Sequence, residues 1–355
     1  MRIVNSVLGD ATGGRWQVVC DYSRVLSQQG FPVLMLLNKR HLPDLDRVPD
    51  GVSVALVNNR GHYDYPASWA ARRQLRSFAP DMAIAHCSRS VALLKRALKG
   101  IAPVVAVSHS NKVRRLLPAD AYLPLTSHIR ENIQLASGGA IGKPCFVIPN
   151  MIAVNDADSL SARRLKQPVR IGALGRFDPV KGFDVFIDAL GVLRSQGLPF
   201  QAVLGGEGQE RQRLVDRTRQ LGLTEQLELP GWIDRTDEFL AGLDVLCVPA
   251  RSDAFGLSPL QAAVAGVPMV LSRAPGHLEM LSEETEALFC DIGDSSATAE
   301  QLVRLINDAG LAEQLRQAAF QRVLRCYSEK VVTDKLLQAL NQISKIYSNY
   351  KYKYI

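Results

Sequence analysis

The 355-residue sequence lacks several features that would place a protein in a membrane, outside the cell or around a metal ion. No apolar run approaches the ~18 residues that span a bilayer. The first residues lead into a strand-like run rather than into the regions of a signal peptide. The six cysteines include no pair at CxxC spacing, which gives no support for zinc or a redox dithiol. We therefore expect a cytoplasmic chain.

Acidic residues are scarce in the first part of the chain. Residues 1–150 hold 19 Lys and Arg against 9 Asp and Glu, whereas the rest holds 23 against 26. This excess of positive charge predicts an anionic partner, either a membrane surface, a phosphorylated acceptor or nucleic acid, or else only a solubilising surface. The sequence has no zinc finger, KH-type loop or aromatic RNP motif, so we expect no nucleic acid.

Short apolar runs alternate with helical patterns through the first half of the chain. Helix-like segments such as Gly14–Gln29 and Ser88–Lys99 lie between the runs. Continuous Val, Ile and Leu runs separated by helices are typical of buried parallel strands. Residues 1–154 are therefore predicted to form a Rossmann-like domain. Its strand-like runs are Arg2–Leu8, Pro32–Leu37, Val52–Val57, Met82–Ala85, Val104–Val107 and Phe146–Ile148.

A second series of the same kind follows a polar break. Residues 155–168 have no strand pattern and end at Pro168, so we interpret them as a linker. We expect a second Rossmann-like domain over residues 169–329 and a C-terminal helix over residues 330–355 that crosses back to the first domain. The fold class is then α/β, with two doubly wound domains facing across a cleft and ligands at the strand C-terminal ends. The strand-like runs of the second domain are Val169–Leu174, Phe200–Leu204, Leu227–Leu229, Val245–Val248, Met269–Leu271 and Ala287–Cys290.

A glycine pair, Gly13-Gly14, follows the first strand and precedes a helix. Glycine lets the backbone approach a ligand closely, and the helix N-terminus offers free N–H groups and a partial positive charge. This suits a phosphate or a sugar oxygen, although such a pair is often only a turn. The nearby glycines do not complete a G-x-G-x-x-G fingerprint, which argues against an NAD(P) oxidoreductase.

The loop Gly175–Gly182 again joins a strand to a helix, and it carries two cations. Arg176 and Lys181 lie five residues apart, so both side chains can point at one anion in front of the helix N-terminus. A diphosphate leaving group needs neutralisation of this kind. The loop alone is equally consistent with two solvated cations.

A third motif, residues 249–268, follows the strand-like run Val245–Val248. Gly256 and Leu257 lie just before a helix of small residues, so their N–H groups are available to phosphate oxygens. Asp253 lies in the loop and Gln261 about one turn into the helix. Both side chains can therefore reach hydroxyl groups on either side of a bound diphosphate.

The second and third motifs together resemble retaining glycosyltransferases of family four, which are group 1 glycosyltransferases with the GT-B fold. That family has a G-R-x-x-x-x-K-G loop and a later S-E-x-F-G-L segment with a second glutamate eight positions after the first. The order and spacing match over residues 169–275. Val147-Ile148-Pro149-Asn150 is similar to the family's interdomain Pro-Asn-Gly turn, with Met151 in place of glycine.

The resemblance implies roles for individual residues. His109 corresponds to an N-domain histidine near the reacting sugar, and Asp253 and Gln261 replace the family's paired glutamates. Gln261 would hydrogen-bond the ribose without charge assistance, and Asp253 is one methylene shorter than glutamate. The implied catalytic residues are His109, Asp253, Arg176 and Lys181. The implied donor-binding residues are Gly13, Gly14, Arg176, Lys181, Gly206, Phe255, Gly256, Leu257 and Gln261.

The resemblance also implies an activity: transfer of a hexose from a nucleotide-diphosphate sugar, with a UDP-sugar expected, to a saccharide or lipid-linked acceptor in lipopolysaccharide or exopolysaccharide biosynthesis. No cofactor and no metal is expected. Asp44-Leu45-Asp46 has the form of a metal motif but lies in a polar loop. The basic N-terminal domain would bind the acceptor and contact an anionic membrane peripherally, at the inner face of the plasma membrane. The alternative is a GT-B-fold binding or scaffold protein that its altered glutamate pair has left catalytically weakened.

Overall fold

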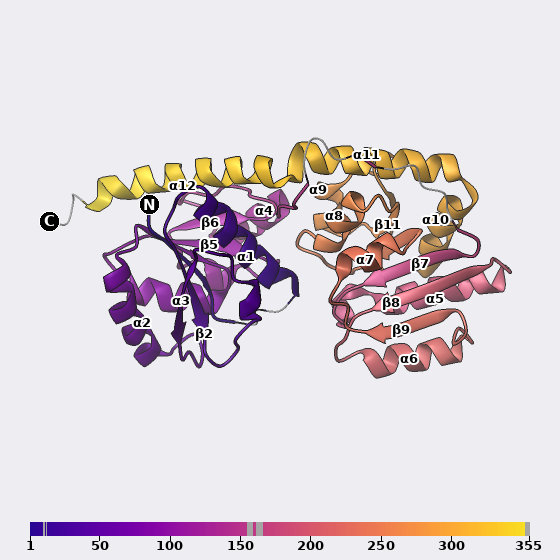
Figure 1. The fold of residues 1–355 in the computed structure, drawn as a ribbon, viewed down its shortest axis with the longest axis horizontal. Coiled ribbons are helices and arrows are strands. Elements are labelled where there is room, and N and C mark those ends of the chain that lie inside the picture. Colours follow the sequence, from indigo (N-terminus) through magenta and orange to yellow (C-terminus); the bar gives the residue numbers. More distant parts are fainter. Residues whose placement is uncertain (10, 12, 155–158, 161–165, 352–355) are drawn as a thin grey trace. The chain divides into compact units, whose positions relative to one another are not determined.

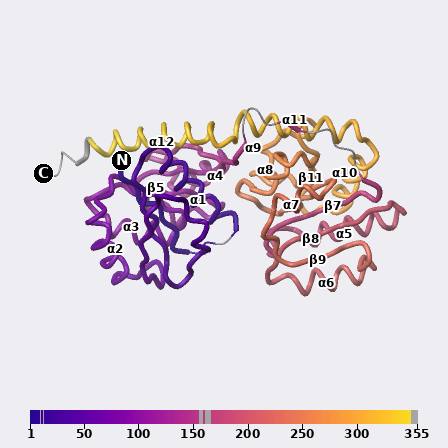
Figure 2. Tube along the Cα trace, viewed as in Figure 1, coloured from indigo at the N-terminus to yellow at the C-terminus, as the bar shows by residue number. Residues whose placement is uncertain are grey.

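The computed structural model describes residues 1–9, 11, 13–154, 159–160 and 166–351. The chain divides into two compact units (Figures 1 and 2), the N-terminal unit Met1–Met151 with Lys330–Ile355 and the C-terminal unit Ile152–Glu329. Most of the predicted linker over residues 155–168 lies outside the described residues. No helix in the described part of the chain is long and apolar enough to cross a membrane.

The N-terminal unit contains a parallel six-stranded sheet in the order β3-β2-β1-β4-β5-β6. Every residue of β1, β2, β4 and β5 is buried, which explains their continuous apolar runs. The strand order reverses between β1 and β4, so ligands are expected at the C-terminal ends of these strands. The strands are β1 (Ile3–Val7), β2 (Val33–Asn38), β3 (Ser53–Val57), β4 (Met82–Ala85), β5 (Val104–Ser108) and β6 (Ala121–Pro124).

Helices flank this sheet, and one of them comes from the far end of the sequence (Figure 1). They are α1 (Gly13–Gln28), α2 (Tyr65–Phe78), α3 (Ser88–Ala97), α4 (Ser127–Ala136) and α12 (Glu329–Lys351). In α12 the Tyr347 hydroxyl donates to the Asp120 carbonyl at 2.7 Å. A fully buried stripe on the same helix explains its place in this unit: Val332, Leu336, Leu340 and Ile343.

The C-terminal unit has a second parallel six-stranded sheet, in the order β12-β11-β10-β7-β8-β9. Its order reverses between β7 and β10. Helix α5 packs beside α6 and α10, and α8 packs beside α7 and α11. The strands are β7 (Val169–Leu174), β8 (Phe200–Gly205), β9 (Leu227–Gly231), β10 (Val245–Val248), β11 (Met269–Ser272) and β12 (Leu288–Cys290). The helices are α5 (Phe183–Ser195), α6 (Arg211–Gln220), α7 (Thr236–Ala241), α8 (Leu257–Val264), α9 (Pro275–Met280), α10 (Ser295–Asn307) and α11 (Ala309–Tyr327).

One predicted strand, Phe146–Ile148, is wrong, and the observed strand β6 (Ala121–Pro124) was not predicted. Phe146–Ile148 runs beside β6 and donates from Phe146 N–H to Tyr122 and from Ile148 N–H to Pro124, but it is not a strand. Pro124 has no N–H, so it cannot return a bond and the ladder does not continue. The Asp44-Leu45-Asp46 segment, which we did not expect to bind a metal, has a local role, because Asp44 accepts from the Asp46 N–H and caps a short 3₁₀ helix.

Candidate functional site

Two loops leave the C-terminal ends of β7 and β10, the strands at the switch point of the C-terminal unit, and they contact each other. The Arg251 N–H donates to the Val180 carbonyl at 2.8 Å. Gly182 has a φ of +67°, and a Cβ there would lie 2.2 Å from the Pro249 carbonyl oxygen. Only glycine permits this approach. The loop Gly175–Gly182 and the segment before α8 therefore form one site.

Lys181 and Asp253 form an ion pair within that site. Lys181 Nζ lies 2.7 Å from Asp253 Oδ2, and the two side chains are 29% and 12% exposed. Burial by itself raises the pKa of Asp253, but the Lys181 charge and then His277 lower it, and the pKa lies well below its ordinary value. Asp253 is therefore a carboxylate at neutral pH, and it fixes the position of the Lys181 ammonium.

The structure adds His277, which the sequence analysis did not identify. This fully buried side chain donates from Nδ1 to the Ser272 carbonyl at 3.0 Å. Its Nε2 lies 3.9 Å from Asp253 Oδ2, beyond hydrogen-bond distance, and has no partner among the described residues. A Cβ on Gly276 would lie 2.6 Å from the Asp253 carbonyl oxygen, so glycine lets α9 pack against the Asp253 loop. The Pro275-Gly276 start of α9 is the sequence signal that points to this packing.

Arg176 differs from Lys181 in its surroundings. Its side chain is 58% exposed, and its Nη2 lies 3.7 Å from Asp178 Oδ2. Asp178 also accepts from the Val180 N–H and caps the short 3₁₀ helix Pro179–Lys181. The two predicted diphosphate ligands thus lie on one loop, but Lys181 is held inward by Asp253 while the Arg176 guanidinium is accessible to a ligand.

The N-terminus of α8 presents backbone donors at this site. Gly256, with a φ of +95°, precedes the helix, and no side chain caps it. The first N–H groups of α8 are therefore available to an anion. The Phe255 side chain is buried and packs edge-on against Tyr327, with ring centroids 5.3 Å apart, so Phe255 can offer a ligand only its backbone. Gln261 lies about one turn into α8 and is half-buried.

Gly206 brings the end of β8 against the end of β7. A Cβ on Gly206 would lie 1.9 Å from the Gly175 carbonyl oxygen. The Gly206 N–H donates to the Gly231 carbonyl at 2.7 Å. Trp232 follows Gly231 and is 53% exposed. An exposed indole at these strand ends can stack on a planar ring. The sequence analysis missed Trp232, and its only signal is its position after a strand.

In the N-terminal unit, α1 begins at the predicted glycine pair. Gly13 has a φ of +56°, which favours glycine, and the first turn of α1 holds no acidic residue. Arg15 follows directly in the same turn. Residues 10 and 12 of the preceding loop lie outside the described residues. The pair therefore starts a helix whose N-terminal turn is cationic.

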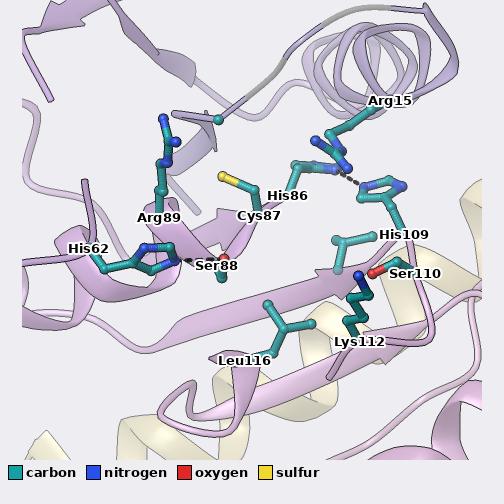
Figure 3. A pocket seen from close by; sticks show the side chains of 12 residues that line it. Arg15, His62, His86, Cys87, Ser88, Arg89, His109, Ser110, Lys112 and Leu116 are labelled. Carbon is teal, nitrogen blue, oxygen red and sulfur yellow. Dashed lines mark hydrogen bonds between the residues drawn. The ribbon is translucent and has the colours of Figure 1, made fainter. Parts of the chain in front are cut away.

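His109, at the end of β5, pairs with His86, at the end of β4. His109 Nε2 and His86 Nδ1 are 2.9 Å apart, and the rings are stacked (Figure 3). Burial, followed by the charge of Arg15, lowers the pKa of His109 to about 3. Burial also holds the pKa of His86 well below its ordinary value, with smaller contributions from His109 and Arg15. Both imidazoles are therefore neutral at pH 7. The sequence analysis identified His109 but not His86.

The histidine pair lines a cavity of about 190 Å³ in the N-terminal unit (Figure 3). Residues with nitrogen-bearing side chains dominate its wall: Arg15, His62, His86, Arg89, His109 and Lys112. Gly13 and Gly14 are not among the lining residues. The predicted residues thus fall into two groups, with the glycine pair and His109 in the N-terminal unit and the remainder in the C-terminal unit.

Comparison with known proteins finds a family match in the C-terminal unit. Residues 158–322 match the family described as glycosyl transferases group 1. The chain is 25% identical over 277 residues to the lipopolysaccharide core biosynthesis glycosyltransferase LpsD of Rhizobium meliloti (strain 1021), covering 77% of this chain and 79% of LpsD. It is 31% identical over 214 residues to a phosphatidyl-myo-inositol mannosyltransferase of Mycobacterium leprae (strain TN), covering 58% of this chain and 55% of that protein.

Solved structures share the fold of the whole chain. Anabaena Alr3699/HepE in complex with UDP superposes with a TM-score of 0.79 at 17% identity, covering 96% of this chain and 100% of that one. The lipopolysaccharide outer core galactosyltransferase WaaB superposes with a TM-score of 0.77 at 17% identity, covering 96% and 99%. Two Rossmann-like units of this kind define the GT-B class of fold. The chain is a glycosyltransferase, and its residues 158–322 are similar to group 1 of that class.

Proposed function

We propose that this glycosyltransferase transfers a hexose from a UDP-sugar to a saccharide or lipid-linked acceptor during synthesis of a cell-surface glycan. The observation that carries the proposal is the contact between the loop Gly175–Gly182 and the segment before α8. That contact supports a single site made of Arg176, the Lys181–Asp253 pair and the first N–H groups of α8. The UDP complex of HepE and the role of LpsD in lipopolysaccharide core biosynthesis support the choice of donor and product.

The proposed site neutralises the leaving group. Cleavage of the sugar–phosphate bond leaves negative charge on the diphosphate, and stabilising that charge is the main catalytic demand. The exposed Arg176 guanidinium can donate two parallel hydrogen bonds to phosphate oxygens. The α8 N-terminus adds backbone donors. Lys181, held by Asp253, supplies positive charge at a fixed position.

The sugar and the ribose contact the residues that replace the family's glutamates. Asp253 remains ionised beside Lys181, so its carboxylate can accept from a sugar hydroxyl. Gln261 contacts the ribose through a neutral amide. His109, kept neutral, offers a hydrogen bond to the transferred sugar. The family resemblance adds that the reaction retains the anomeric configuration and requires neither cofactor nor metal.

The acceptor binds the N-terminal unit in this proposal. The excess of Lys and Arg over residues 1–150 favours an anionic acceptor and peripheral contact with an anionic membrane. Reaction at the cytoplasmic face of the plasma membrane would bring the enzyme to a lipid-linked acceptor. Vesicle flotation with and without anionic lipid tests the membrane contact separately from catalysis.

Release of the free nucleotide from a panel of UDP-, GDP- and ADP-hexoses tests the proposed function. We expect the purified chain to turn over a UDP-hexose, and the Lys181→Met variant to be slower by at least about tenfold, because it loses a fixed charge beside the leaving group. Arg219→Ala serves as a control, since Arg219 lies on α6 and is 64% exposed. Nucleotide binding without turnover of any donor would favour the scaffold alternative and overturn the proposal.

A further inference from the structure

The cavity in the N-terminal unit (Figure 3) is lined by positively charged side chains and by no carboxylate among the described residues. Its wall includes Arg15 from the first turn of α1, Arg89 from α3, and Lys112 from the segment after β5. None of the twelve described residues that line it carries a carboxylate. Figure 3 shows Arg89 on one side of the cavity and Arg15 and Lys112 on the other. The cations therefore surround the space rather than forming one patch beside it.

Two of these cations are not neutralised by any residue that the structure describes. Arg89 and Lys112 make no ion pair or hydrogen bond with any residue in the described part of the chain. Their neighbour His62 hydrogen-bonds Ser88 at 2.8 Å. Burial, then Arg115, Arg89 and Arg96, lower the pKa of His62, which is the direction expected near uncompensated positive charge. The site thus presents positive charge that an anion would neutralise.

The histidine pair supplies neutral hydrogen-bonding groups at the same place, one N–H and one acceptor nitrogen, because the other N–H is used within the pair. His86 is 1% exposed, and its Nε2 has no hydrogen-bond partner among the described residues. A buried polar atom without a partner is unfavourable, because it has lost its hydrogen bonds to water. A polar ligand in the cavity, or an ordered water beneath it, would remove that cost. The wall therefore combines charged and neutral hydrogen-bonding groups.

The size of the cavity limits what it can hold. Its volume of about 190 Å³ is below the ~300–1,000 Å³ of pockets for drug-sized ligands. It suits one compact charged group with part of a sugar ring and is too small for a whole nucleotide. A phosphate monoester carries nearly two negative charges and three acceptor oxygens. A carboxylate has one charge and two oxygens, so a site with two cations that no described residue neutralises is better matched by phosphate.

We infer that this cavity binds a phosphate monoester carried by the acceptor, and that it thereby selects a phosphorylated sugar over an unphosphorylated one. The inference rests on the proposed function for the identity of the ligand as acceptor. Arg89 and Lys112 contact the phosphate, Arg15 adds charge from the α1 N-terminus, and the histidines bind neighbouring polar atoms. The acceptor must then come from a reaction that phosphorylates a sugar hydroxyl.

Isothermal titration of the full chain with glucose 6-phosphate, glucose and glucuronate tests the inference. We expect glucose 6-phosphate to bind and glucose to bind at least about tenfold more weakly, since each charge-assisted contact contributes about a tenfold factor. Arg89→Gln and Lys112→Gln should each weaken glucose 6-phosphate binding about tenfold. Arg73→Gln, on the exposed face of α2 and outside the cavity, is the matched control and should bind as the wild type does.

Several outcomes would overturn the inference. Equal affinities for the Arg73 and Arg89 variants would show that the phosphate binds elsewhere, and tighter binding of glucuronate would assign the cavity to a carboxylate. Displacement of glucose 6-phosphate by UDP would assign the cavity to the donor. A separate UDP titration keeps the two proposals apart, because a chain that binds glucose 6-phosphate here but no UDP would contradict the proposed donor and leave the phosphate site standing.

Discussion

Asp253 would have two roles at the proposed donor site. Its carboxylate holds Lys181 at 2.7 Å, and its Oδ1 lies 3.4 Å from the Phe255 N–H in the turn before α8. A carboxylate that also has to contact the sugar must do so with its remaining lone pairs. Asp253 is shorter than the glutamate it replaces, but it still provides a negatively charged carboxylate. In the proposed site it would tie the orientation of the sugar to the position of Lys181.

The neutral histidine pair predicts a pH dependence of stability. His86 and His109 have lowered pKa values in the folded chain, about 3 for His109, whereas unfolded histidines titrate near 6.5. The unfolded state therefore binds more protons below pH 6.5, so this stability is complete above 6.5 and is lost as pH falls toward 3. We expect the midpoint temperature of thermal unfolding to decrease as the pH is lowered from 7 to 4.5, and to decrease less in His109→Gln than in the wild type.

The control for this measurement is His41→Gln, at an exposed position outside the cavity. It should keep the wild-type slope of midpoint against pH. An equal slope for wild type and His109→Gln would show that the pair is not held neutral by the fold.

At the level of helices, strands and loops, the proposed donor site depends on loops that approach one another more closely than a Cβ atom would permit. Gly182 meets Pro249, and Gly206 meets Gly175, at distances that exclude a Cβ. These glycines keep the loops after β7, β8 and β10 in contact at the sheet end where the charged residues gather. The precision of the site is therefore set by the backbone as much as by Arg176 and Lys181.

Gly182→Ala should separate these loops. The alanine at position 182 would have an unfavourable φ of +67°, and its Cβ would clash with the Pro249 carbonyl. Gly197→Ala has a similar φ of +73°, but its Cβ would have no atom within 4 Å. The left-handed conformation costs about 1–2 kcal/mol in each variant. Overpacking adds about 1–3 kcal/mol to Gly182→Ala only. Denaturant unfolding should show this difference, and equal losses in the two variants would mean that the contact with Pro249 is unimportant.

Much of this architecture is predictable because parallel strands and helices have strong local signals. Eleven of the predicted apolar runs overlap an observed strand, and Gly14–Gln29 overlaps α1 closely. Phe146–Ile148 has the same composition but fails as a strand because its partner β6 ends in a proline. The sequence pattern of a segment does not reveal whether the neighbouring strand has the N–H groups needed to form a ladder with it.

The site was predictable only as separate motifs. Lys181 and Asp253 were both identified, but their ion pair joins residues 72 positions apart and depends on packing. His86 and His277 belong to no motif recognised in the sequence, and their roles follow from buried contacts made by the fold. Roles that depend on long-range proximity therefore required the structure.

At the scale of the molecule, the chain returns at its end to the unit in which it began. Helix α12 follows the C-terminal unit in sequence, yet Lys330–Ile355 belongs to the N-terminal unit. Its buried stripe and the Tyr347–Asp120 hydrogen bond attach it there. The N-terminal unit therefore includes a helix that follows the C-terminal unit in sequence.

Leu336→Ala tests this contribution of α12. Leu336 is fully buried, so its truncation should destabilise the chain by about 2–5 kcal/mol through lost burial and a residual cavity. Ile346 lies on the same helix but is 41% exposed, and Ile346→Ala should stay within about 0.5 kcal/mol of the wild type. Urea unfolding monitored by circular dichroism measures both, and equal effects would show that α12 is not part of the folded unit.

Isothermal titration with UDP measures whether the loop Gly175–Gly182 binds the diphosphate of the donor, as we propose. Arg176→Ala should weaken UDP binding about 10- to 150-fold, which corresponds to the loss of about 1.5–3 kcal/mol of charge-assisted hydrogen bonding. Arg219→Ala, which removes an equally exposed arginine from α6, should leave the affinity unchanged. UDP binding of equal strength in the wild type and Arg176→Ala would contradict the account.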